Sequence, residues 1–76
     1  MVIRSIAHEE IGKGRARIIV DTAEIKPGRY ETMALRPSGR ELACKYAAGE
    51  DQAMADFAEV LAMFSGNRFD SGRKSV

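Results

Sequence analysis

The chain has 76 residues, 45% of them hydrophobic, and a formal net charge of +1 from 12 bases and 11 acids. A chain of this length forms one small domain of marginal stability, and its near-neutral charge excludes the overall basic character of a strong nucleic-acid binder. The single cysteine, Cys44, excludes an internal disulfide and a multi-cysteine zinc cluster.

An N-terminal β-hairpin is the first predicted element. β-Branched residues indicate a strand at Val2 to His8 and a second at Ala16 to Asp21, and Gly12 and Gly14 between them supply the positive φ angles of a tight turn. Two registers fit this hairpin, and the sequence leaves both open. The first pairs Ile6 with Val20 and His8 with Ile18, and the second pairs Ile6 with Ile19 and Arg4 with Asp21.

A second hairpin follows the turn signal Pro27-Gly28, with strands at Tyr30 to Leu35 and Glu41 to Tyr46 around the reversal RPSGR. The expected register places Leu35 opposite Leu42, Met33 opposite Cys44 and Glu31 opposite Tyr46. One face then bears Met33, Leu35, Leu42, Cys44 and Tyr46, and we expect it to be the core. The other face bears Tyr30, Thr32, Ala34, Arg36, Glu41, Ala43 and Lys45, and we expect it to be open.

The last predicted element is an amphipathic helix capped by Gly49, with acids in its first turn and its end near Phe64. Its apolar stripe comprises Met54, Phe57, Ala58 and Leu61, widened by Ala53, Val60 and Phe64. The fold class is therefore α+β, an antiparallel meander sheet of three or four strands with one C-terminal helix on one face. Residues 1–66 form the domain, and 67–76 are expected to be a flexible tail.

No stretch of the chain carries a catalytic signature. A cysteine nucleophile would need Cys44 and His8 to meet, whereas the predicted pairing places Cys44 in the core. The GKGR segment, 12–15, lacks the spacing of a phosphate-binding loop and is expected to be a hairpin turn. One histidine and one cysteine are too few for an ordinary zinc site. We expect no enzyme, metal or cofactor.

Arginine outnumbers lysine eight to four, and most of these bases lie in the predicted strands and turns. Guanidinium groups suit bidentate contacts to phosphate or carboxylate. The candidate binding residues are Arg15, Arg17, Tyr30, Arg36, Arg40 and Lys45. With one aromatic on the open face, stacking of single-stranded bases is not favoured.

Roughly half of the chain, from RYETM to the end of the helix, resembles short uncharacterised bacterial proteins, some of them phage-associated. The resemblance lies in the YETM strand at Tyr30 to Met33, the hairpin, and the acidic start of the helix at Glu50 and Asp51. It implies a small α+β fold and a mobile-element origin, but no mechanism.

Function is therefore expected to reside in surfaces. The leading hypothesis is a non-enzymatic module that forms a homodimer and docks a protein partner. The alternative is a nucleic-acid-binding accessory protein that contacts phosphates through its basic sheet and hairpins. MVIRSIAHEE is too charged for a signal peptide and no run approaches the ~18 apolar residues of a membrane span, so we expect a cytoplasmic protein.

Overall fold

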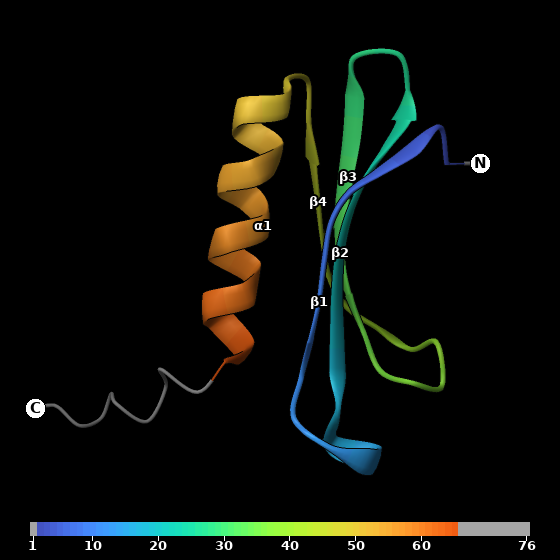
Figure 1. Cartoon of the computed structure of the whole chain (residues 1–76), viewed down its shortest axis with the longest axis vertical. Coiled ribbons are helices and arrows are strands. Elements are labelled where there is room, and N and C mark those ends of the chain that lie inside the picture. The colour runs from blue at the N-terminus through green and yellow to red at the C-terminus, as the bar shows by residue number, and fades with distance from the viewer. Residues whose placement is uncertain (1, 66–76) are drawn as a thin grey trace, which may run out of the picture.

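The computed structural model describes residues 2–65, and the predicted tail lies outside the described residues. Its elements are β1 (Arg4–Ile11), β2 (Ile18–Lys26), β3 (Arg29–Leu35), β4 (Glu41–Ala47) and α1 (Glu50–Phe64). The strands form one antiparallel sheet in the order β1-β2-β3-β4, and α1 packs on one face of it (Figure 1). The predicted α+β meander is confirmed. Within residues 2–65, no helix is long and apolar enough to cross a membrane.

The N-terminal hairpin is longer than the sequence indicates. β1 continues to Ile11, which pairs with Ile18, and His8 pairs with Asp21. Both predicted registers are therefore wrong. The whole segment 12–17 forms the turn and includes a short 3₁₀ helix, and this six-residue turn gives the strands a different register from that of a tight reversal.

The turn between β2 and β3 is the predicted Pro27-Gly28 pair, with Gly28 at a φ of +74° that favours glycine. The Gly28 amide donates a hydrogen bond to Glu24 Oε2 at 3.1 Å. This bond, followed by the bond from Arg4 Nε at 2.8 Å, lowers the pKa of Glu24. Arg4 also lies 3.2 Å from Glu50, so one guanidinium connects β1, β2 and the start of α1.

The hairpin of β3 and β4 has the predicted register over most of its length. Met33 lies opposite Cys44 and Glu31 opposite Tyr46, as expected. The pairing of Leu35 with Leu42 is wrong, because an irregularity places Leu35 opposite Glu41. The extra residue, Leu42, instead packs against the core under the helix.

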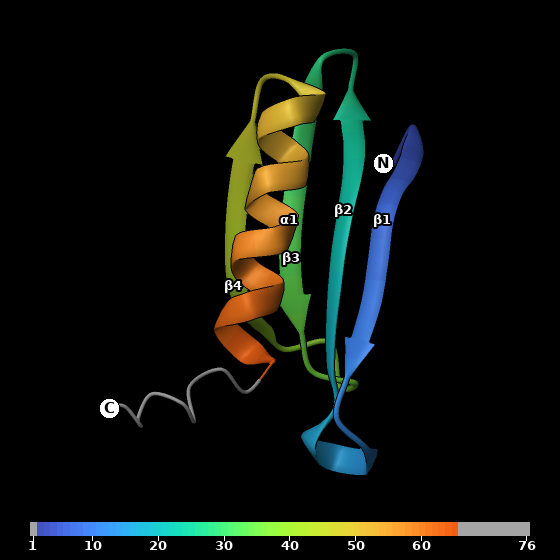
Figure 2. The ribbon, with the colours of Figure 1, turned by 60° about the vertical axis from the view of Figure 1, so that its left-hand side comes forward.

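The helix covers the face of the sheet that the sequence predicts to be open. Tyr30, Thr32 and Ala34 are all buried, and Figure 2 shows α1 lying across β3 and β4. The prediction that Met33 and Cys44 face the core is therefore wrong. Thr32 and Ala34 are small, so the helix can approach the backbone of β3 closely enough to interdigitate with it.

The core is formed by Ile18, Val20, Ala34 and Val60. Partly buried side chains pack around it: Ile11, Leu42, Ala43, Phe57, Leu61 and Phe64. Met54 is exposed, so α1 is rotated relative to its predicted stripe. The largest fully buried side chains within residues 2–65 are valines and threonines, which makes this a thin core.

The other part of the helix–sheet interface is polar. The buried hydroxyls of Thr22 and Thr32 lie 2.7 Å apart and form a hydrogen bond. Asp56 of α1 is only 3% exposed and accepts a hydrogen bond from Gln52 at 2.9 Å. Lys45 Nζ lies 3.8 Å from the same carboxylate. These polar groups require partners when buried, so they favour a single position of α1 on the sheet.

Candidate interaction surfaces

The face of the sheet away from α1, the open face, consists of three rows of side chains that run across all four strands. Residues directly opposite one another on antiparallel strands point to the same face. The rows are Ser5, Ala23, Glu31 and Tyr46, then His8, Asp21, Met33 and Cys44, then Glu10, Ile19, Leu35 and Glu41. Polar side chains dominate at β1, whereas the central strands β2 and β3 combine the apolar Ala23, Ile19, Met33 and Leu35 with the acids Asp21 and Glu31.

The apolar strip, defined as Ile19, Met33, Leu35 and Tyr46, crosses β2, β3 and β4 on the open face. Tyr46 is 67% exposed, and the other three are only half-buried although they are large. Large apolar side chains exposed together on one face are typical of an interaction site. Acids of the open face lie beside the strip, and the bases of this face include His8 on β1 and Arg29, which alternates with the buried residues of β3 as Glu31 and Met33 do.

Two of the predicted binding residues lie on the covered face instead. Tyr30 is 7% exposed under the helix. Lys45 Nζ donates a hydrogen bond to Glu59 at 2.7 Å, which raises the pKa of Lys45. The prediction that these two side chains share an open face with the arginines is therefore wrong.

The other four predicted residues come together at one end of the molecule. Arg15 and Arg17 belong to the β1–β2 turn, and Arg36 and Arg40 to the β3–β4 turn. In a meander these two turns lie at the same end of the sheet, as Figure 1 shows at the bottom of the view. Lys13 lies in the first of these turns as well and was missing from the predicted set. The predicted meander order could have grouped these bases, because it places the first and third turns at the same end of the sheet.

Cys44 and His8 share a row of the open face but lie on its opposite edge strands, β4 and β1. Three strand spacings separate them, or about 14 Å. His8 Nδ1 instead lies 3.1 Å from Asp21 Oδ1. Burial raises the pKa of the Cys44 thiol and the Glu31 carboxylate raises it too, so the thiol is protonated near neutral pH. The two side chains do not form a nucleophile–base pair.

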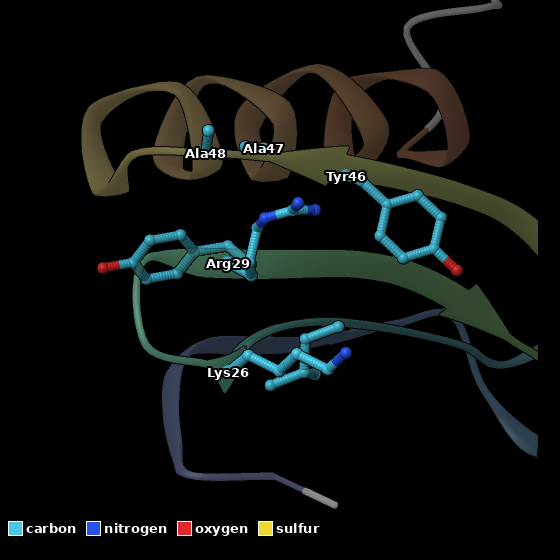
Figure 3. A pocket seen from close by; sticks show the side chains of 7 residues that line it. Lys26, Arg29, Tyr46, Ala47 and Ala48 are labelled. Carbon is cyan, nitrogen blue, oxygen red and sulfur yellow. The ribbon is translucent and has the colours of Figure 1, made fainter.

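A pocket of 360 Å³ lies at the end of the sheet where β2 turns into β3 (Figure 3). Its lining is Ile25, Lys26, Arg29, Tyr30, Tyr46, Ala47 and Ala48. Figure 3 shows the Arg29 side chain extending from β3 toward β4. Cys44 and Glu31 raise the pKa of Tyr46 to about 12, so its hydroxyl is a hydrogen-bond donor at neutral pH. No carboxylate, thiol or imidazole lines this pocket, and its titratable side chains are Lys26, Arg29, Tyr30 and Tyr46.

Within residues 2–65, no three acidic, histidine or cysteine side chains lie close enough to hold a metal ion. The GKGR segment is a hairpin turn, as predicted, and leads into β2 rather than into the long helix of a phosphate-binding loop. No family model matches this chain, and the searches of curated proteins and of solved structures found no match either. The resemblance to short bacterial proteins therefore stays a prediction.

Proposed function

We propose that the protein is a small non-enzymatic interaction module that self-associates through the open face of its sheet. The observation that carries this proposal is the apolar strip on that face. Within residues 2–65 no helix or loop covers the strip, although α1 packs on the opposite face and buries Tyr30, Thr32 and Ala34 of β3. Burying the strip against a second copy would remove its apolar surface from water.

The thin core supports the same proposal. The buried side chains under α1 are small, so a chain of this size gains little hydrophobic stabilisation from one face alone. A second sheet packed at ~10 Å on the open face would make a second apolar layer. Dimerisation and stability would then be linked, because association favours the folded chain.

The size of the face predicts how tight the dimer is. Four strands spaced ~4.8 Å apart, each about seven residues long at ~3.4 Å per residue, span roughly 19 by 24 Å. Treated as flat surfaces, two such faces would bury roughly 900 Å² in total, and protruding side chains would add to this area. The value is close to the ~1,000 Å² lower limit of specific interfaces. We therefore expect a reversible dimer whose population rises with concentration.

The distribution of charge on the open face also suits a second copy. Specific interfaces combine an apolar centre with a polar rim. Met33 and Leu35 lie on a central strand, whereas His8 and Glu10 lie on the edge strand β1. Stacking the β2–β4 parts of two sheets buries the strip, with Asp21 and Glu31 beside it, and leaves the polar β1 edges at the rim.

Sedimentation velocity over roughly a hundredfold range of concentration tests the proposal. The wild-type chain should shift from monomer to dimer as concentration rises. Met33→Glu places a charge at the centre of the strip and should remain monomeric with a native circular dichroism spectrum. Ala58→Glu adds the same charge on the exposed side of α1 and should dimerise like the wild type.

Three outcomes would overturn the proposal. One is a wild-type chain that stays monomeric over the whole range. Another is a Met33→Glu variant that dimerises as the wild type does. The third is an Ala58→Glu variant that loses the dimer equally, since the association would then depend on charge or on another face.

A further inference from the structure

Two hairpin turns at one end of the sheet concentrate positive charge. We call them the basic tips, residues 12–17 and 36–40. They contain five bases and no acid, namely Lys13, Arg15, Arg17, Arg36 and Arg40. Acids next to the tips in sequence are Glu10 and Glu41, which lie in β1 and β4. The opposite end carries Lys26 and Arg29 together with the acids Glu50 and Asp51 of the start of α1, so charge there is mixed.

Four of the five charges of the basic tips are not neutralised within the described part of the chain. Arg17 lies 3.5 Å from Glu10, and its buried Nε has no hydrogen-bond partner. The other four bases make no ion pair with any residue in 2–65. Elsewhere, Arg4 and Lys45 each contact two carboxylates. Lys26 and Arg29, at the opposite end, also make no ion pair within residues 2–65. The tips therefore differ from the rest of the described surface in the number of unpaired cations, four of which lie in two short turns.

Backbone hydrogen bonds hold both tips in defined turns. In the first tip, the Ala16 amide donates to the Lys13 carbonyl at 3.1 Å. In the second, the Gly39 amide donates to the carbonyl of Arg36 at 2.8 Å, and the Arg36 amide donates to that of Arg40 at 2.9 Å. The bases are thus presented from ordered turns, which lowers the entropy lost when they bind a ligand.

The spacing of the tips suits a regular array of anions. The β1–β2 and β3–β4 turns are two strand spacings apart, or about 10 Å. Duplex DNA carries one negative charge per ~1.7 Å of its axis, so ~10 Å of duplex presents about six phosphates. Guanidinium groups bind phosphate oxygens in a bidentate geometry, and four of the five bases are arginines.

We propose that the basic tips bind the phosphate backbone of duplex DNA without reading its sequence. The tips contain no aromatic residue, so they have no platform on which unpaired bases could stack. They are turns rather than a helix or a strand that could enter the major groove, so contacts to base edges are not expected. Binding by the tips directs the acids of the start of α1 away from the duplex, because those acids lie at the other end of the molecule (Figure 1).

Fluorescence anisotropy of the full chain with a labelled mixed-sequence duplex of about 20 base pairs tests this proposal. Five phosphate contacts predict a slope of log K against log salt concentration of about −4.5. Affinity should therefore fall about 500-fold between ~50 and ~200 mM salt.

Two matched double variants locate the contacts. Arg36→Gln with Arg40→Gln removes two cations from the basic tips and should reduce the magnitude of the slope by about 2. Lys26→Gln with Arg29→Gln removes two cations from the opposite end and should leave the slope unchanged. An equal decrease in the magnitude of the slope in both variants would overturn the proposal, because binding would then depend on the total charge and not on the tips.

Three further results would also overturn it. The first is the absence of binding at ~50 mM salt. The second is tighter binding to the single strand of the same sequence, which would indicate base stacking. The third is equal competition by polyglutamate, which would assign the tips to an acidic protein. The Met33→Glu variant should show the same slope of log K against log salt concentration as the wild type when binding is calculated per protomer. This test is therefore independent of self-association.

Discussion

The two faces of the sheet are formed by the same strands but differ in burial, because α1 packs on only one of them. On β3, Thr32 and Ala34 lie under the helix and are fully buried, whereas Met33 and Leu35 alternate with them on the open face and remain partly exposed. At the middle of β3 the covered face therefore carries the smaller side chains, and the larger Tyr30 is buried on the same face at the start of the strand. Close approach of a helix requires small residues beneath it, so side-chain size decides which face is covered as much as hydrophobicity does.

The largest expected effect comes from placing a charge between the helix and the sheet. Val60→Asp puts a carboxylate into the core beside Val20 and Ala34. We expect a loss of about 3–5 kcal/mol in the free energy of unfolding, enough to unfold a domain of this size. Ala58→Asp, on the exposed side of α1, should change it by about 0.5 kcal/mol or less. Urea denaturation followed by circular dichroism compares the two.

A sharper comparison uses two adjacent residues of β3 that point to opposite faces. Ala34→Met overfills the covered face and should cost about 1–3 kcal/mol. Met33→Ala empties a partly exposed position on the open face and should cost less than about 1 kcal/mol in the monomer. The same denaturation experiment, run at a concentration where the chain is monomeric, measures both. If Met33→Ala lowers the free energy of unfolding more than Ala34→Met does, the assignment of the covered and open faces is wrong.

The hydroxyl pair under the helix makes the next prediction. Thr22→Val or Thr32→Val alone leaves one buried hydroxyl without its partner and should cost about 1–3 kcal/mol. The double variant removes both hydroxyls and should be less destabilised than the sum of the singles. A double-mutant cycle gives the coupling, and strictly additive losses would show that the two groups do not interact.

The smallest effect is the pH dependence of the open face at β1. The hydrogen bond to Asp21, aided by Glu10, raises the pKa of His8 above its ordinary value of 6.5. A raised pKa in the folded state means that the charged ring favours folding. This contribution is complete below pH 6.5 and is lost as pH rises through the folded pKa.

Because His8 is half exposed, solvent screening limits the effect to about 0.5 kcal/mol or less. Stability should therefore decline slightly above pH 6.5 in the wild type but not in His8→Gln. An NMR titration of the ring should show a lower pKa in Asp21→Asn. An unchanged pKa in that variant would remove the Asp21 contact from the explanation.

The sequence predicts most of the secondary structure because its signals are local. Pro27-Gly28 marks the β2–β3 turn and Gly49 the start of the helix, and both are confirmed. The register of β1 could not be predicted in this way. An irregularity between Ser5 and Ala7 shifts the side chains by one position, and the length of the 12–17 turn depends on pairing that hydrophobicity alone does not specify.

The covered face could not be assigned from the sequence because both faces of β3 and β4 contain apolar residues. Ranking these residues by the size of their side chains assigns Met33 and Leu35 to the core. In the structure the helix instead packs on the small side chains of Thr32 and Ala34. The grouping of Arg15 with Arg36 could have been derived, since any four-stranded meander brings its first and third turns to one end. The contacts of Lys45 with α1 could not, because they depend on which face the helix covers.

Methyl nuclear Overhauser effects from Val60 test the central assignment of the two faces most directly. Contact between α1 and the covered face predicts cross-peaks from the Val60 methyls to Val20 and Ala34, and none to Met33. Cross-peaks from Val60 to Met33 or Leu35, in place of those to Ala34, would contradict the assignment. The apolar strip would then be the core, and the proposed self-association through it would fail.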